Sequence, residues 1–140
     1  YGLTRTLAVE GAARNIRVNC IAPLAASRMA GTVFTAEMMR RMRPEAVSPL
    51  VALLCHEKCP DSGAVFEVGA GWIGKLRWER ARGAAFDPLV SHSIEDVATH
   101  WDSITSFAGG DHPHDVESCF APFARNLGIE AGSMVHRREK

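Results

Sequence analysis

Six residues with the spacing of a dinucleotide-binding loop stand near the middle of the chain. The run Gly69-Ala70-Gly71-Trp72-Ile73-Gly74 matches G-x-G-x-x-G letter for letter. In a dinucleotide-binding fold these glycines open a helix whose N-terminus meets the pyrophosphate, and an acidic residue about 20 positions on binds the ribose. Here Lys75 begins a stretch without helical periodicity, and no β-rich run precedes Asp87, the acid nearest the required distance. We therefore interpret the glycines as the end of a strand followed by a turn.

Two groups of metal-ligating side chains also occur. Cys55 and Cys59 are four positions apart with His56 between them, but a zinc site needs about four ligands, and no second Cys/His pair stands at useful spacing. The run Asp111-His112-Pro113-His114-Asp115 lies beside two glycines, a composition typical of a solvated loop. The sequence therefore predicts no metal site, and reduced thiols for the cysteines.

Composition excludes several classes of protein. The chain has 140 residues, 46% apolar and 23% charged, which suits a soluble globular domain. Its 16 basic and 16 acidic residues cancel, so net charge indicates neither nucleic acid nor an anionic membrane as partner. No apolar run is long enough to cross a bilayer. The chain has no initiator Met and no signal-peptide pattern, and we expect it to be a fragment of a longer protein.

The elements that must position any chemistry follow an α/β order in the first half of the chain. We expect a helix over residues 1–13, an apolar strand over 16–22, a loop over 24–34, helices over 36–42 and 44–56, and a strand over 64–68. Pro23 should end the first strand, because proline cannot donate to a sheet ladder, and Thr35 should cap the second helix. Cys20 and Cys55 lie in apolar runs and should be small core residues. This order is typical of a doubly wound, Rossmann-type parallel sheet.

The remainder, residues 75–140, is expected to be a helical C-terminal extension to the domain of residues 1–74. Ser93 should cap a helix reaching residue 107, and a weaker helix over 115–127 should be interrupted near Pro122. The last ten residues should fray. The basic, aromatic stretch over 72–82 is predicted to be a packing segment with Trp72 and Trp78 as anchors, because a nucleic-acid surface would need a wider positive field.

Two stretches carry a resemblance to a known family. The helical run from Gly2 to Glu10 followed by Ile16-Arg17-Val18-Asn19 and Pro23 resembles the segment after the Tyr-x-x-x-Lys motif of short-chain dehydrogenases/reductases. Aligned in this way, Tyr1 is not the catalytic tyrosine and Arg5 is not the catalytic lysine. The resemblance places the tyrosine, lysine, serine and asparagine of the reaction, and the glycine-rich loop, before residue 1. No catalytic residue is therefore expected in this chain.

Further residues narrow the resemblance to one branch of that family. Leu24 replaces the family's usual glycine, and the run from Phe66 to Arg80 is similar to the dehydrogenase units of multifunctional enzymes of peroxisomal fatty-acid β-oxidation. The similarity is strong over residues 1–82 and weak over 84–107. It implies an NAD-dependent oxidation of a (3R)-3-hydroxyacyl-CoA, a homodimer, and a hydratase domain further along the chain. It also implies a peroxisomal location, or a cytoplasmic one for a bacterial protein.

The same resemblance implies a cofactor contact. In the family the loop after this strand lies against the nicotinamide, so Pro23, Ala26 and Ser27 are the expected cofactor-binding residues. The segment from Met29 to Met42 would form a thioether-rich wall over the acyl chain, a use that suits methionine. The tryptophan-rich run would close a subunit or domain contact.

Two other interpretations stay open from the sequence. One is a short-chain dehydrogenase of another substrate class, such as a ketoacyl or steroid reductase. The other is a non-catalytic module that binds partners through residues 72–80. We expect the isolated chain to form no NADH from NAD and a (3R)-3-hydroxyacyl-CoA. A cooperative melt of that chain would favour the module, because a half-sheet with an open edge should aggregate.

Overall fold

The computed structural model describes residues 1–130 and divides the chain into two compact units, Tyr1–Arg77 and Trp78–Lys140. The predicted boundary between residues 74 and 75 falls inside a β-strand, Trp72–Leu76, so the first unit keeps that strand whole. The expected fraying of the last ten residues lies outside the described residues.

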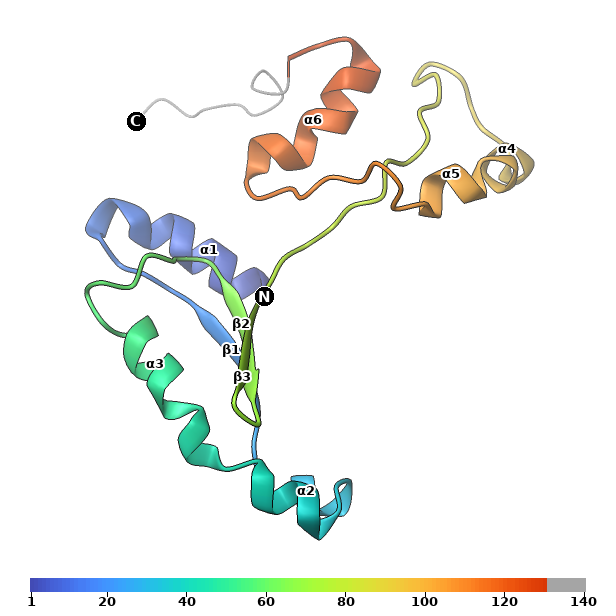
Figure 1. Ribbon diagram of the computed structural model, residues 1–140. Coiled ribbons are helices and arrows are strands. Elements are labelled where there is room, and N and C mark those ends of the chain that lie inside the picture. Colours follow the sequence, from blue (N-terminus) through green and yellow to red (C-terminus); the bar gives the residue numbers. More distant parts are fainter. Residues whose placement is uncertain (131–140) are drawn as a thin grey trace. The chain divides into compact units, whose positions relative to one another are not determined.

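The first unit is a mixed α/β layer built on a three-stranded sheet of order β1-β2-β3, in which β1 and β2 are parallel and β3 is antiparallel to β2. Helices α1 and α3 lie alongside this sheet, and α2 lies beyond the end at which β1 finishes (Figure 1). This confirms the predicted α/β class. The elements are α1 Gly2–Gly11, η1 Ala12–Arg14, β1 Cys20–Leu24, η2 Ala30–Thr32, α2 Ala36–Arg41, η3 Pro44–Ala46, α3 Ser48–Leu54, β2 Val65–Gly69 and β3 Trp72–Leu76.

The position of Pro23 corrects the prediction for the first strand. The strand begins at Cys20 rather than residue 16, and Pro23 lies inside it, opposite Val68 of β2. Among the described strands β1 pairs only with β2, so it is an edge strand. Proline is tolerated there because a missing N–H on the open side costs no ladder hydrogen bond.

Residues 16–19 do not pair as part of a strand. They instead form hydrogen bonds with the segment before β2. The Asn19 side chain donates from Nδ2 to the Asp61 carbonyl (2.9 Å) and accepts at Oδ1 from the Ala64 N–H (3.1 Å). Arg17 Nη1 donates to the Glu57 carbonyl at 2.6 Å. These bonds join residues 40 to 45 positions apart and fix where β2 begins beside β1.

The G-x-G-x-x-G run forms a β-hairpin, which confirms that its glycines turn the chain. Ala70 (φ 48°) and Gly71 (φ 81°) both have positive φ and connect β2 to β3 as a two-residue turn of the type that matches strand twist. The strand after the turn, β3, was not predicted. Gly74 leaves room for the Trp72 ring, because a Cβ at this position would displace it.

The buried side chains of the first unit come from both strands and helices. Val65 and Val68 of β2 are 8% and 3% exposed, and Leu50 of α3 is 6% exposed. The prediction of a core position for Cys55 was wrong: α3 ends at Leu54, so Cys55 is its exposed C-cap, whereas Cys59 is buried. Cys20 is half-buried, and all four cysteines are free thiols.

Two predicted helices of this region differ in their details. Thr35 caps α2 as expected, with Oγ1 accepting from the Met38 N–H at 3.3 Å. The single helix predicted over 44–56 is instead two, η3 and α3, because each begins with a proline at its first turn, Pro44 and Pro49. Proline suits a first turn but interrupts a longer helix.

The second unit contains α4 Ile94–Thr99, α5 Trp101–Thr105 and α6 Val116–Leu127. Ser93 and Asp96 form a reciprocal capping box at α4, which confirms the predicted helix start. The predicted helix is broken at His100, whose ψ of 6° leaves the helical range. Trp78 and Trp72, expected as packing anchors, are 58% and 59% exposed; their burial in a subunit contact stays a prediction.

Helix α6 runs through Pro122 without the predicted interruption. Proline lacks the N–H that would bond the carbonyl four residues earlier, which is that of Ser118. The Arg80 guanidinium supplies the missing donor: Nη2 bonds the Ser118 carbonyl (3.0 Å) and Nη1 the Cys119 carbonyl (2.9 Å). Arg80 also pairs with Asp111 through its backbone and through two side-chain bonds of 3.0 and 2.7 Å. One arginine therefore joins three segments of the unit.

Candidate functional site at the carboxyl edge of the parallel strands

The two parallel strands end side by side. Leu24, the last residue of β1, is in register with Gly69, the last residue of β2. In open α/β sheets ligands bind outside the carboxyl ends of the strands. The segment after β1, residues 25–42, folds beyond this end of the sheet, where α2 lies (Figure 1). We call this segment the edge lobe.

The structure places the three predicted cofactor residues together at this edge. Pro23 lies exposed in β1, and Ala26 and Ser27 follow where the chain leaves the sheet. The Ala26 N–H already donates to the Met42 carbonyl at 2.6 Å, so this amide holds the lobe closed and does not face a ligand. Ser27 Oγ accepts from the Ala30 N–H at 3.1 Å. Its hydroxyl proton can therefore be donated outward, because a hydroxyl accepts and donates at once.

The methionines of the edge lobe have two distinct environments. Met29 is 83% exposed and Met38 is 45% exposed, which suits the predicted thioether-rich wall. Met42 is only 4% exposed. It belongs to the buried core, and its carbonyl accepts from the Ala26 N–H. A wall over an acyl chain that includes Met29 and Met38 stays a prediction.

The basic side chains of the edge lobe and of Arg43, the next residue, were not predicted from the sequence as residues of the site. Glu37 forms ion pairs with both Arg40 and Arg41, and Arg43 lies 3.5 Å from Glu45. All these side chains are more than half exposed. The neutral total concealed an asymmetry: residues 1–77 carry ten basic and six acidic residues, whereas 78–140 carry six and ten.

Electrostatics in the second unit serve its folding. The hydrogen bond to Asp111 raises the pKa of the Arg80 guanidinium, and the same bond lowers the pKa of the Asp111 carboxyl. Hydrogen bonds from the Ser93 backbone and hydroxyl lower the pKa of Asp96. His112 Nδ1 lies 3.2 Å from the Trp78 carbonyl. The residues considered as a metal clip are thus engaged in holding a loop.

Residues 1–130 lack two kinds of feature. That part of the chain contains no group of three His, Cys, Asp or Glu side chains arranged to hold a metal ion. It also has no helix long and apolar enough to cross a membrane.

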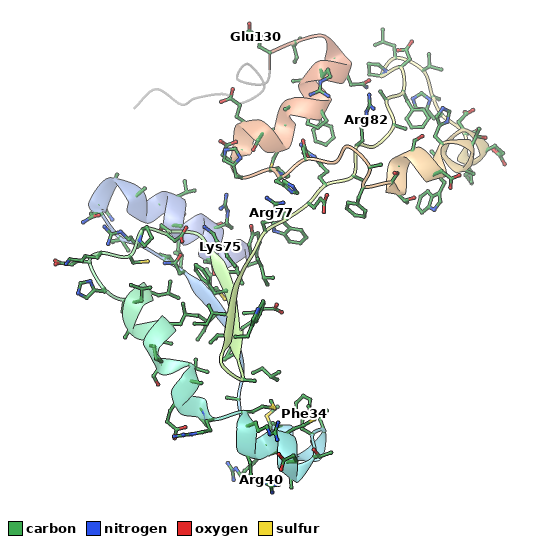
Figure 2. All side chains as sticks on the ribbon, viewed as in Figure 1. Phe34, Arg40, Lys75, Arg77, Arg82 and Glu130 are labelled. Atoms are coloured by element: carbon green, nitrogen blue, oxygen red, sulfur yellow. The ribbon has the colours of Figure 1, made fainter. Side chains whose placement is uncertain are left out.

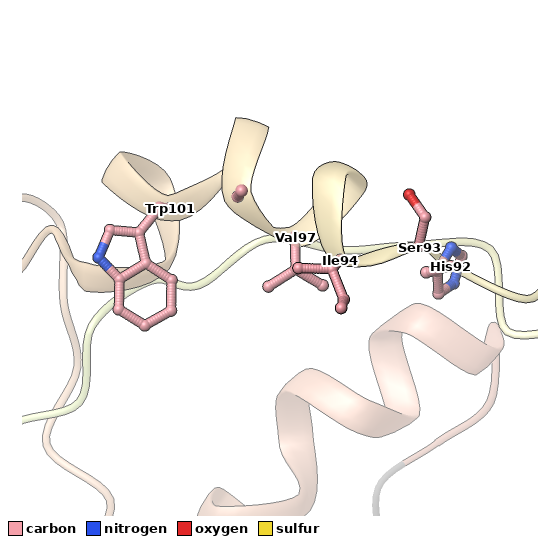
Figure 3. A pocket seen from close by; sticks show the side chains of 6 residues that line it. His92, Ser93, Ile94, Val97 and Trp101 are labelled. Carbon is pink, nitrogen blue, oxygen red and sulfur yellow. The ribbon is translucent and has the colours of Figure 1, made fainter.

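An open depression lies along α4 and α5, lined by His92, Ser93, Ile94, Val97, Ala98 and Trp101 (Figure 3). Ile94 is 84% exposed, so the depression is the face of an amphipathic helix rather than an enclosed site.

The parallel pair β1-β2, the antiparallel β3 and the helices alongside them define the class as a mixed α/β protein. No family model matches the chain. Two curated relatives are similar over most of it. Peroxisomal multifunctional enzyme type 2 of Mus musculus is 45% identical over 120 residues, covering 83% of this chain and 16% of that protein. Peroxisomal hydratase-dehydrogenase-epimerase of Neurospora crassa is 37% identical over 134 residues, covering 94% and 15%.

Solved structures agree with these relatives. Full-length peroxisomal multifunctional enzyme type 2 from Drosophila melanogaster matches 91% of this chain and 23% of its own, with a TM-score of 0.78 and 29% identity. A short chain dehydrogenase from Mycobacterium avium matches 74% and 35%, with a TM-score of 0.54 and 33% identity. Over most of its length the chain is therefore homologous to a segment of these peroxisomal multifunctional enzymes, and it is related to the short-chain dehydrogenases/reductases. It spans about one sixth of the length of the mouse and Neurospora relatives.

Proposed function

We propose that this chain supplies the cofactor- and substrate-facing edge of an NAD-dependent (3R)-3-hydroxyacyl-CoA dehydrogenase of fatty-acid β-oxidation. The observation that carries the proposal is the edge lobe at the carboxyl end of β1. It occurs in a chain that is 45% identical to the mouse multifunctional enzyme over 120 residues. A relative whose name includes hydratase, dehydrogenase and epimerase supports the same assignment.

The residues at this edge fit a nicotinamide carboxamide, which has N–H donors and a carbonyl acceptor. The Ser27 hydroxyl provides a donor for the carbonyl, and main-chain carbonyls near Ala26 provide acceptors for the amide. The bond from the Ala26 N–H to the Met42 carbonyl (2.6 Å) holds these groups in place. Pro23 restricts the backbone just before them. NAD, when bound, would accept the hydride from the substrate carbon.

The chain's own contribution is binding and orientation. Its exposed Met29 and Met38 offer adaptable apolar contacts to an acyl chain. The proposal assigns it no catalytic residue, because the resemblance places the proton-transferring tyrosine and its partners before residue 1. We further propose a peroxisomal location, a homodimer closed in part by the exposed Trp72 and Trp78, and a hydratase domain as a covalent partner.

A chimera tests this function directly. The matched segment of the mouse relative would be replaced by the corresponding residues of this chain, and NADH formation would be followed with (3R)-3-hydroxyacyl-CoA. We expect turnover with the acyl-CoA and none with a steroid alcohol. Absence of NADH with the acyl-CoA, in a chimera that folds, would reject the function, and a preference for the steroid would favour the other substrate class.

Ser27→Ala in that chimera tests the cofactor contact. Loss of one donor to the carboxamide should raise the KM for NAD by about fivefold to tenfold, because a hydrogen bond contributes about 1 kcal/mol. The KM for the acyl-CoA should change little. The matched control is Ser91→Ala, an exposed serine of the second unit. An unchanged KM for NAD in Ser27→Ala would remove Ser27 from the cofactor site.

A further inference from the structure

Four arginines lie in the edge lobe or directly after it, with only two carboxylates near them in the sequence. Arg28, Arg40, Arg41 and Arg43 lie within 16 positions; Glu37 stands among them, and Glu45 follows two positions after Arg43. Arg40 belongs to α2 and is labelled in Figure 2. We propose that these arginines, called here the arginine patch, bind the phosphate groups of coenzyme A. This inference rests on the proposed function and names the substrate group that the lobe recognises.

The fold brings the two ends of the patch together. The 2.6 Å bond from the Ala26 N–H to the Met42 carbonyl joins positions two residues before Arg28 and one residue before Arg43. The η2 turn also packs on α2, because a Cβ at Gly31 would lie 3.7 Å from Met39 Cε. The basic residues therefore belong to one folded lobe and not to an extended loop.

The arginines retain positive charge for a ligand. Arg40 and Arg41 share the single carboxylate of Glu37, and their side chains are 68% and 78% exposed. The Arg43–Glu45 pair is long at 3.5 Å, with side-chain exposures of 73% and 71%. Among the described residues Arg28 has no ion pair. Exposed pairs of this kind are weak, and a guanidinium binds phosphate oxygens in a bidentate, charge-assisted way.

The chemistry of coenzyme A matches both properties of the lobe. It carries a pyrophosphate and a 3′-phosphate at one end and an apolar acyl chain at the other. The lobe combines the arginines with exposed apolar side chains, Met29 at 83% and Val33 at 76%. The surrounding unit is also positive, with ten basic and six acidic residues, and would attract an anionic ligand. A free anion would use the patch without the apolar side chains.

Calorimetric titration of the full 140-residue chain tests the proposal with coenzyme A, dephospho-coenzyme A, pantetheine and inorganic pyrophosphate. We expect coenzyme A to bind most tightly and the double variant R40A/R41A to bind it about tenfold more weakly. The variant should bind pantetheine as the parent chain does. Arg14→Ala is the matched control, because Arg14 ends η1 at the opposite, amino end of β1.

Glu37→Gln should change the affinity for coenzyme A in the opposite direction. Removing the carboxylate frees both guanidinium groups, so coenzyme A should bind about threefold more tightly. Circular dichroism would confirm that each variant keeps the helix content of the parent. Equal binding of coenzyme A by R40A/R41A and the parent would overturn the proposal, and so would equal losses in Arg14→Ala. Pyrophosphate binding as tight as that of coenzyme A would reduce the patch to a general anion surface and also overturn it.

The outcome is separable from that of the proposed function, because binding needs neither NAD nor turnover. In the chimera, R40A/R41A should lower kcat/KM for the acyl-CoA and leave that for the acyl-pantetheine unchanged. A chimera that forms NADH while the variants bind coenzyme A normally would retain the function and reject the patch. Arginine-dependent binding of coenzyme A without NADH formation would support the arginine patch and reject the proposed function.

Discussion

At the scale of single residues, Arg80 connects separate segments of the second unit. Its guanidinium bonds two carbonyls of α6 and the carboxylate of Asp111. One of these carbonyls, that of Ser118, lost its intrahelical donor to Pro122. The side chain is 28% exposed, so the bonds are partly shielded from water. An arginine at this position allows a proline inside the helix without a break.

Arg80→Ala should therefore lower the stability of α6 by about 2 kcal/mol, the range for hydrogen bonds to charged groups. Pro122→Ala restores the N–H that bonds Ser118, so the same change should cost about half as much in that background. Hydrogen exchange of the α6 amides would measure both effects. The control is Arg82→Ala, an exposed arginine two positions away. Equal costs of Arg80→Ala in the two backgrounds would show that Arg80 does not replace the missing donor.

At the scale of elements, the sequence predicted correctly those features that depend on neighbouring residues. Thr35 and Ser93 both cap helices where their residue types indicated. The errors arose where a distant segment supplies what the local sequence lacks. Pro23 lies within a strand because one side of β1 is unpaired among the described strands, and Pro122 lies within a helix because Arg80, 42 positions earlier, provides donors. No periodicity in the sequence contains that information.

The candidate site was predictable in part for the same reason. The expectation that Pro23, Ala26 and Ser27 contact the cofactor came from the family resemblance, and it stays a prediction. The engagement of the Ala26 amide by Met42 was hidden, because this bond joins residues 16 apart through a bend. Strand β3 was missed because its turn is Ala70-Gly71, which lacks the Asn-Gly or Asp-Gly pair that signals a two-residue hairpin. The same run matches a dinucleotide motif, and the spacing of its glycines does not indicate a hairpin.

The hairpin itself makes a prediction at this scale. Ala70 has a φ of 48°, a left-handed conformation that costs a residue with a Cβ about 1 kcal/mol. Ala70→Gly should therefore stabilise the first unit by about 0.5–1 kcal/mol, part of the gain being lost to the greater chain entropy of glycine. Urea unfolding followed by circular dichroism would measure it. Ala85→Gly, an exposed coil position with negative φ, is the control and should be neutral or destabilising.

At the scale of the whole molecule, zero net charge conceals two oppositely charged halves. Residues 1–77 carry a formal charge of +4 and residues 78–140 one of −4, from ten against six and six against ten charged residues. A neutral protein with evenly mixed charges would have weak electrostatic interactions with its copies. A protein with separated charges attracts them, because the positive part of one copy faces the negative part of another.

Self-association of the chain at pH 7 should therefore fall as salt rises. The Debye length shrinks from about 30 Å at 0.01 M salt to about 10 Å at 0.1 M, so attraction between exposed charges is screened across this range. Light scattering at both salt concentrations would measure the change. Association through exposed apolar side chains such as Leu89 (92%) would be maintained or strengthened by salt, which gives the opposite result. The variant R40Q/R41Q lowers the charge of the positive half, and it should reduce association at low salt while leaving that at high salt unchanged.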